Sequence, residues 1–390
     1  MVSIAVSHLC LGIALVLLAL SKTPLRAPAV VWPFGGFLAW TALSAAVSGD
    51  AAAALPQFKK FFVFAVLIVA FSLFRTIDQA RRLSEAWFAC AVAAALWSIV
   101  QFVQKWSAAR RASVDFLIFY TPDRITGFFS HWMTFSQALL LVFLLLVSYL
   151  LFSSSGQRGR SVWLGCAIVC AVALGMSWTR SVWIALVVTG GYLCWHWHRK
   201  LLLAIPVLIA VIYVTAPGAG RQRLESIVHP DATEPRLIMW ATGARMIAAY
   251  PWFGVGPEQV GPRFREFLTA DVGTLPDAYY GHLHNIYVHY AAERGIPAVV
   301  FLLWFFVKLL WDHTRALRLL PPSGRDDRRF VLHGVIAATL GVMVVGCFDV
   351  TLGDSEVLGI YLALVALGYR AVEGVGLRAG GVVAVGSTSQ

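Results

Sequence analysis

Charged residues are scarce in this sequence, and their scarcity excludes a soluble globular protein. Only 13% of the 390 residues are charged, whereas 59% are hydrophobic and the mean hydropathy is +0.74. No aqueous core could bury that much apolar surface. In a lipid bilayer the backbone must satisfy its own hydrogen bonds, so long apolar runs form helices. The composition therefore predicts an all-α polytopic membrane protein.

Cysteine is also scarce, and its positions exclude a disulfide framework or a zinc motif. All six cysteines lie inside apolar segments, where they behave as small hydrophobic residues. The N-terminus lacks the basic region and the cleavage site of a secretory signal, so we expect a retained first span. The net charge of +11 comes from basic residues scattered between apolar runs, which indicates membrane anchoring and not nucleic-acid binding.

Eleven apolar segments have the length of a membrane span, and a count of ten or twelve is also possible. The criterion is that a spanning helix needs roughly 20 mostly apolar residues. The predicted spans are 4–20, 30–47, 61–74, 87–103, 134–152, 162–178, 182–195, 201–216, 296–311, 331–348 and 357–372.

One long polar interval, residues 217–281, separates the eighth and ninth spans. Irregular backbone at membrane level persists only where it lines a cavity or water, so we expect the functional site there. The sequence predicts four regions: transmembrane helices in 1–216, an outer loop with short catalytic helices in 217–295, transmembrane helices in 296–375, and a disordered tail in 376–390.

Basic residues in the connections predict the orientation of the chain. If the long interval lies outside, most basic connections lie inside, although the connection 105–124 carries four basic residues outside. Eleven spans would then leave the N-terminus outside, unless one span is missing. The residues predicted inside are Arg75, Arg81, Arg82, Arg158, Arg160, Arg199, Lys200, Arg315, Arg318, Arg325, Arg328 and Arg329.

The densest polar group extends from His282 to His289, just before the ninth span. We interpret it as a short helix at the outer membrane surface, with His282 before the helix and His284 facing the space beneath the long interval. A neutral imidazole there could take a proton from an attacking hydroxyl. The alternative is an interfacial histidine that anchors the helix beside lipid headgroups. A metal site is less favoured, because no carboxylate or cysteine stands at ligand spacing.

Two stretches place arginines where a lipid-linked phosphate could bind. Arg180 lies in a very short outside turn, and Arg236 and Trp240 lie close together on an amphipathic helix. Two or three converging arginines would neutralise a pyrophosphate through bidentate hydrogen bonds. Snorkelling to ordinary headgroups is the alternative for Arg180. Solvated surface arginines are the alternative for Arg245, Arg263 and Arg265.

Taken in order, these stretches resemble the O-antigen ligase and polymerase superfamily of bacterial membrane glycosyltransferases, over roughly residues 124–298. The family's His-Asn, nine residues and Gly-x-x-Gly pattern corresponds to His284, Asn285, Gly295 and Ala298, where alanine replaces the last glycine. The other matches are Arg180 after a Ser-x-Thr turn, Arg236 and Trp240 of Arg-x-x-x-Trp, Pro251, Gly254 and Gly256 of Pro-x-x-Gly-x-Gly, and the Gly-rich turn 125–131.

The resemblance implies a GT-C fold with about twelve spans and neither a metal ion nor another cofactor. The absence of an Asp-x-Asp motif agrees with metal independence. It implies an enzyme of the bacterial inner membrane that transfers a polysaccharide from undecaprenyl pyrophosphate to a lipid A-core hydroxyl in the periplasm, with inversion. The implied roles are general base for His284, pyrophosphate binding for Arg180, Arg236 and Arg245, and substrate orientation for Asn285, Tyr287, Trp240 and His282.

Other activities remain open at this level. An O-antigen polymerase and a protein O-oligosaccharyltransferase of the same superfamily are the alternatives. A lipid or polysaccharide transporter is less favoured, because most predicted spans carry no charge and the chain shows no repeated halves.

Overall fold

The chain is all-helical in the residues that the computed structural model describes. These are 4–21, 24–50, 52–154, 159–215, 218–228, 235–269, 272, 281–321, 326–373 and 375. Seven helical segments among them are long and apolar enough to cross a membrane, and three further apolar helices are shorter. The prediction of an all-α polytopic membrane protein is confirmed. The predicted tail 376–390 lies outside the described residues.

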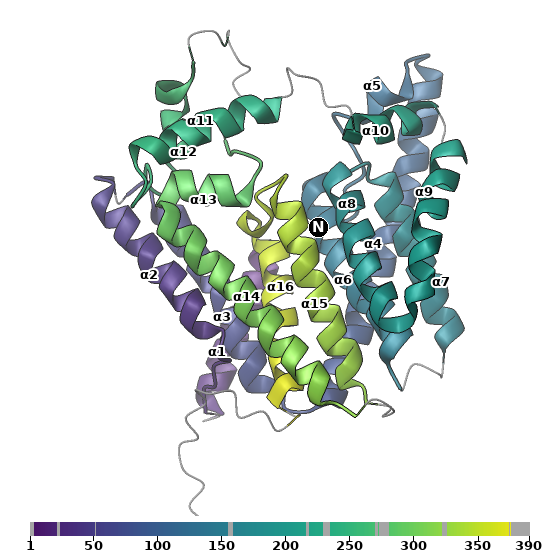
Figure 1. The fold of residues 1–390 in the computed structure, drawn as a ribbon, viewed down its shortest axis with the longest axis horizontal. Coiled ribbons are helices and arrows are strands. Elements are labelled where there is room, and N and C mark those ends of the chain that lie inside the picture. Colours follow the sequence, from purple (N-terminus) through teal and green to yellow (C-terminus); the bar gives the residue numbers. More distant parts are fainter. Residues whose placement is uncertain are drawn as a thin grey trace, which may run out of the picture.

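Each of the eleven predicted spans falls on a helix of the membrane region (Figure 1). These helices are α1 (Ile4–Leu20), α2 (Val31–Val47), α3 (Leu55–Leu73), α4 (Ile77–Arg111), α6 (Trp132–Phe152), α7 (Arg160–Met176), α8 (Arg180–His198), α9 (Ala204–Thr215), α14 (Ile296–Leu319), α15 (Arg328–Gly346) and α16 (Ser355–Glu373).

The largest departure from the predicted bounds is α4, which has 35 residues and extends beyond 87–103 at both ends. Hydropathy overlooks these ends because they are polar. The helix starts where Thr76 and Gln79 form a capping box, and it ends just after Arg110 and Arg111. Between α8 and α9 the chain turns through the 3-10 helix η2 (Arg199–Leu203), after an extended His198.

The centre of the bundle consists of α6, α15 and α16, which are its most buried long helices. α15 packs closely against α6 because Gly334 and Gly341 face Leu145 and Leu144 across the contact. Peripheral helices instead expose large apolar side chains, which suits contact with lipid. Examples on α1, α7 and α9 are Leu17, Leu20, Val162, Ile168, Val207 and Leu208.

Short α-helices gather at one end of the bundle (Figure 1). On one side, α10 (Gly218–Val228) packs against α5 (Phe116–Tyr120) and α8. On the other side, α11 (Pro235–Ala249) packs against α13 (Ile286–Arg294), with α12 (Val260–Arg263) and the 3-10 helix η3 (Phe264–Phe267) beside them. This end therefore holds the helices of the long polar interval, as far as that interval is described.

Candidate functional site

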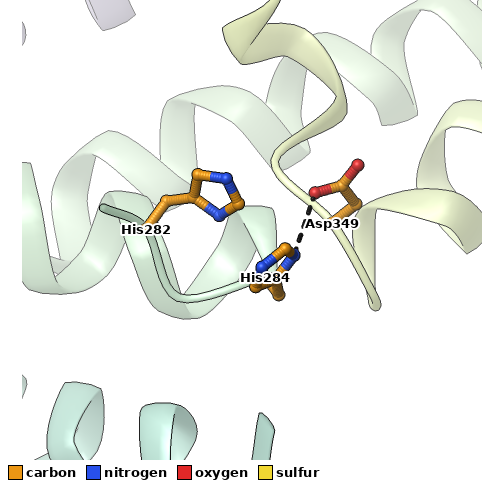
Figure 2. Close-up of side chains that lie close together, drawn as sticks. All are labelled: His282, His284 and Asp349. Carbon is orange, nitrogen blue, oxygen red and sulfur yellow. Dashed lines mark ion pairs between the residues drawn. The ribbon is translucent and has the colours of Figure 1, made fainter. Parts of the chain in front are cut away.

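His284 and Asp349 form the centre of a polar site at the end of the bundle that carries the short helices (Figure 2). Nδ1 of His284 lies 3.3 Å from Oδ1 of Asp349, and the ring of His282 lies 4.1 Å, centroid to centroid, from that of His284. Asp349 belongs to the loop between α15 and the 3-10 helix η5 (Thr351–Gly353). Its Oδ2 accepts a 2.6 Å hydrogen bond from Nε2 of Gln137 on α6. The site therefore joins two distant parts of the chain.

Asp349 carries its negative charge in spite of being buried. Burial alone would raise the pKa of this carboxyl, but the contact with His284 and the charges of His284 and His282 outweigh burial and lower the pKa. The ionised carboxylate faces Nδ1 of His284, which favours the tautomer with its proton on Nδ1. Nε2 is then the basic nitrogen of His284, and it can accept a proton from a hydroxyl.

His284 precedes the helix that the sequence predicted to contain it. α13 begins at Ile286 because Asn285 is its N-cap: Oδ1 of Asn285 accepts hydrogen bonds of 3.0 and 3.1 Å from the N–H groups of Tyr287 and Val288. His284 has φ +46°, a left-handed conformation that is uncommon for a residue other than glycine. The prediction that His284 lies within this helix was therefore wrong, because Asn285 caps the helix and His284 comes before the cap.

Asn285 and Tyr287, which the sequence predicted to orient substrate, attach α13 to α15. Nδ2 of Asn285 donates a 3.0 Å hydrogen bond to the carbonyl of Cys347. The hydroxyl of Tyr287 donates one of the same length to the carbonyl of Met343. Because these polar groups have protein partners, the two side chains position the helix and, through it, His284.

The two glycine motifs meet at a close crossing between the loop 251–257 and α13. Gly254 and Gly295 have φ +67° and +86°, and a Cβ atom on Gly295 would lie 1.9 Å from the carbonyl oxygen of Trp252. Gly256 N–H donates a 2.9 Å hydrogen bond to the carbonyl of Glu293. Nε1 of Trp40, on α2, donates to the carbonyls of both Trp252 and Arg294, at 3.3 and 3.0 Å.

Arg180 belongs to a group of arginines at the start of α8. The carbonyl of Trp178 accepts hydrogen bonds from Nη1 of Arg124, at 3.0 Å, and from Nε of Arg223 on α10, at 3.3 Å. Nη1 of Arg180 donates a 2.7 Å hydrogen bond to the carbonyl of Ser226, also on α10. The carbonyls of Trp178 and Ser226 therefore hold three guanidinium groups in one region.

Arg236, at the start of α11, carries a positive charge that also acts on Arg124, and we group it with these arginines. Burial lowers the pKa of Arg124 to about 9, and the positive charges of Arg223, Arg180 and Arg236 contribute to this shift. An anion bound among them would relieve this mutual repulsion. We call Arg124, Arg180, Arg223 and Arg236 the arginine cluster. Sequence reasoning had singled out only Arg180 and Arg236 of its members.

His131 connects the arginine cluster with His284 and Asp349. It is the N-cap of α6, and its Nδ1 accepts a 3.2 Å hydrogen bond from the N–H of Met133. Burial lowers the pKa of His131, and the charges of Asp349, Arg124 and His284 all act on it. His131 lines the same cavity as Asp349, and the guanidinium of Arg124 lies 4.9 Å from the ring of Trp132, the next residue in the chain. His131 is therefore near both Asp349 and Arg124.

The other predicted residues on α11 behave differently. Arg245 is exposed and donates a 2.9 Å hydrogen bond to the carbonyl of Phe267, and its charge is not among those acting on Arg124. The structure thus favours a structural role for Arg245 over the predicted pyrophosphate contact. Trp240 is half-buried, and its indole N–H has no hydrogen-bond partner among the described residues. That N–H is itself buried.

His282, His284 and Asp349 are also the group of described residues that could hold a metal ion. Their ligand atoms all lie within 4.8 Å of one another. Sequence reasoning had found no carboxylate near the histidines, because Asp349 comes from another part of the chain. Zinc bonds of about 2.0–2.2 Å place neighbouring ligand atoms roughly 3.3 Å apart. Nδ1 of His284 and Oδ1 of Asp349 already have this spacing, and the ligand atoms of the group as a whole lie up to 4.8 Å apart.

Comparison with known proteins adds the family to this geometry. Residues 165–303 match the family model described as O-Antigen ligase. No curated protein matches the chain. The matched region contains Arg180, Arg223, Arg236 and His284, so it includes most of the arginine cluster as well as the histidine beside Asp349. This match covers 139 of the 390 residues and supports the resemblance to the O-antigen ligase superfamily that the sequence motifs indicate.

Proposed function

We propose that this protein is an O-antigen ligase of the GT-C type. It transfers a polysaccharide from undecaprenyl pyrophosphate to a lipid A-core hydroxyl at the periplasmic face of the bacterial inner membrane, without a metal ion. One observation carries the proposal: a His284–Asp349 pair and an arginine cluster lie at the same end of a membrane bundle, with His131 near Asp349 and Arg124. A base and an anion site side by side are what the transfer of a phosphate-linked sugar requires.

The arginine cluster would bind the pyrophosphate of the donor. Pyrophosphate accepts bidentate hydrogen bonds, and guanidinium groups present matching pairs of donors. Arg180 and Arg236 are the predicted contacts, and Arg124 and Arg223 add two more guanidinium groups. As the bond to the sugar breaks, negative charge grows on the leaving oxygen. Loss of one preorganised donor at such a position typically costs about 2.7–4 kcal/mol.

His284 would act as the general base. Nε2 takes the proton of the acceptor hydroxyl while the hydroxyl oxygen attacks the anomeric carbon from the side opposite the pyrophosphate. One carbon–oxygen bond forms, the carbon–oxygen bond to the pyrophosphate breaks, and the configuration inverts. Asp349 stabilises the imidazolium that forms, because its carboxylate faces Nδ1. The indole N–H of Trp240 and the ring of His282 are the remaining candidates for orienting substrate.

An apolar groove gives the donor's isoprenoid chain a place beside this site. Its volume is about 370 Å³, and it lies between α4, α6 and α16. Phe128, Phe129 and Ser130, in the turn that follows Arg124, form part of its wall. A lipid chain in this groove would bring its pyrophosphate close to the cluster. The walls contributed by the helices include Trp87, Ala91, Phe135, Leu139, Val142 and Ile360.

Reconstitution tests the proposal directly. Purified protein in proteoliposomes with lipid-linked polysaccharide and core lipopolysaccharide should form polysaccharide-bearing lipopolysaccharide in the presence of a chelator. A product of lengthened, carrier-linked polysaccharide would identify a polymerase. Transfer to a protein hydroxyl would identify an oligosaccharyltransferase. Absence of any transfer with both lipids present would refute the proposed activity.

A further inference from the structure

A second cavity meets the candidate site from the side of α2, α3, α14 and α16. Its volume is about 660 Å³, within the range of pockets that enclose small ligands. His131, His282 and Asp349 line it, so a molecule inside reaches the residues around His284. No member of the arginine cluster is among its lining residues in the described part of the chain. The cavity is therefore distinct from the arginine cluster, and it adjoins the groove proposed for the donor's lipid chain at Ser130 and Glu356, which line both.

The charges on the wall of this cavity have the opposite sign to those of the arginine cluster. Arg294 is already engaged, since it pairs with Glu293 at 2.9 Å and donates a 2.8 Å hydrogen bond to Gln57. Apart from Glu293 and Arg294, the wall carries the carboxylates of Glu258, Asp349, Asp354 and Glu356 and one positively charged side chain, that of Lys60. A phosphate would be repelled here, whereas carboxylates accept hydrogen bonds from neutral hydroxyl groups. The charged lining residues are Glu258, Glu293, Asp349, Asp354, Glu356, Lys60 and Arg294.

Two wall residues have features that point to a ligand. His289 is 8% exposed, and its Nδ1 has no hydrogen-bond partner among the described residues. A buried polar atom without a partner is costly unless a ligand or water completes it. Glu258 has φ +64°, a strained conformation for a residue other than glycine, and its N–H donates a 2.8 Å hydrogen bond to Glu293. Strain of this kind concentrates at binding and catalytic sites.

The remaining walls suit a sugar attached to a membrane lipid. Phe37 and Tyr290 line the cavity with ring centroids 5.3 Å apart. The guanidinium of Arg294 lies over both rings, at 5.2 and 4.5 Å from their centroids, so a sugar would present its C–H side to the ring surface that Arg294 leaves open. The deeper part is apolar and is formed by membrane helices, which admits an aliphatic segment. Its lining residues there are Phe34, Phe61, Phe64, Leu302, Phe305 and Leu362.

We propose that this cavity binds the acceptor, and that it selects an uncharged sugar of a membrane glycolipid. The inference rests on the proposed transferase function and adds the acceptor's position and chemical class. Glu258 and Glu356 accept hydrogen bonds from sugar hydroxyls, His289 completes the set, and the attacking hydroxyl extends past His282 toward Nε2 of His284. A phosphate on the acceptor sugar would meet the carboxylates and bind poorly.

Steady-state kinetics in proteoliposomes test the assignment. Glu258→Gln and Glu356→Gln keep the size of each side chain and remove its charge, and each should raise the KM for core lipopolysaccharide about tenfold. Glu258→Gln should leave the KM for the donor unchanged, whereas Glu356 also lines the groove proposed for the donor's lipid chain, so Glu356→Gln should raise the donor KM as well. Arg223→Ala should raise the KM for the donor and leave the KM for core lipopolysaccharide unchanged. Glu266→Gln is the matched control, because Glu266 is an exposed carboxylate on η3 that does not line the cavity.

A change of specificity provides a second readout that a purely structural role would not produce. Wild-type protein should use core lipopolysaccharide with a phosphorylated terminal sugar less well than the unphosphorylated form. The double substitution of Glu258 and Glu356 by glutamine should reduce the difference in kcat/KM between the two acceptors. Acceptor KM values equal to those of Glu266→Gln would overturn the inference, as would an unchanged preference against phosphate.

Acceptor binding separates failure of this inference from failure of the proposed function. If wild-type protein transferred nothing, binding of core lipopolysaccharide to the detergent-solubilised protein would be compared without the donor. Weaker binding by Glu258→Gln and Glu356→Gln than by Glu266→Gln would support the cavity assignment on its own. Equal binding by all three variants would refute it.

Discussion

The arginine cluster and the proposed acceptor cavity lie at the same end of the bundle as His284 and Asp349. The charged residues of the cluster are positive, whereas those on the cavity wall are mostly negative. Arg124, Arg180, Arg223 and Arg236 gather positive charge near Trp178. The cavity places mostly carboxylates on its wall. His131 and the His284–Asp349 pair lie at the boundary. Under the proposed function, this difference in charge would direct the pyrophosphate of the donor to the arginine cluster and the neutral sugar of the acceptor to the cavity.

The two regions are also built differently. The arginine cluster draws on separate connections, and backbone carbonyls of Trp178 and Ser226 hold its guanidinium groups. One side of the cavity wall depends on the glycine crossing, where loop 251–257 and α13 exchange backbone hydrogen bonds. We expect the cluster to respond to changes in charge and the cavity wall to changes in backbone packing.

Removal of the base at the boundary should have the largest effect. His284→Ala should lower kcat about 10²- to 10⁴-fold, because general-base catalysis is lost while both lipids still bind. Single-turnover transfer in proteoliposomes measures the effect, and donor binding should stay within about twofold of wild type. Transfer at the wild-type rate would eliminate His284 as the base.

Loss of an arginine from the cluster should come next. Arg236→Ala should lower kcat roughly 10²- to 10³-fold, since it removes a donor to the leaving group. Arg245→Ala, on the same helix but bonded to the carbonyl of Phe267, should change kcat little. Comparison of Arg236→Ala with Arg245→Ala therefore tests whether Arg245 lies outside the arginine cluster. Equal losses in both would show that α11 contributes through its fold and not through one charge.

Asp349→Asn should reduce transfer about 10- to 100-fold, by analogy with the loss of groups that orient a reacting histidine. The carboxyl pKa of Asp349 is depressed from 3.8 in the folded protein, so its stabilising contribution is complete above that value and is lost as pH falls below it. Stability measured from pH 3 to 6 should therefore fall less steeply in Asp349→Asn than in wild type. An identical acid limb would contradict the pairing with His284.

A backbone substitution on the cavity side should have the smallest effect. Gly256→Ala should destabilise the protein by about 1–3 kcal/mol, because Gly256 has φ +105° and its Cβ would lie 2.5 Å from Cβ of Ser48. Gly165→Ala is the control, since nothing lies within 4 Å of its Cβ position on α7. Thermal unfolding in detergent measures both. A loss as large in Gly165→Ala would show that the crossing is not a special site.

Hydropathy predicted the helices of the bundle well because each span must satisfy its own backbone in lipid. The motifs also singled out His284, Arg180 and Arg236. Asp349 was missed because the pairing of His284 with a carboxylate on another connection is a tertiary contact, which spacing along the chain cannot reveal.

Arg124 and Arg223 were missed for a related reason. Both were visible as basic residues, but only the fold brings them to the carbonyl of Trp178. The start of α13 was placed too early because the capping strength of Asn285 was underestimated, although Asn is among the preferred N-cap residues. Local rules thus located the segments, and long-range packing decided which side chains meet.

The indole of Trp40 connects α2 to the crossing of loop 251–257 with α13, through one donor and two carbonyls. A chimaera that exchanged the stretch from α11 to α13 with a relative, but kept this chain's α2, would separate parts that fit together. We expect such chimaeras to fold and function only when α2 is exchanged as well, because the site depends on two segments that are separated in the sequence.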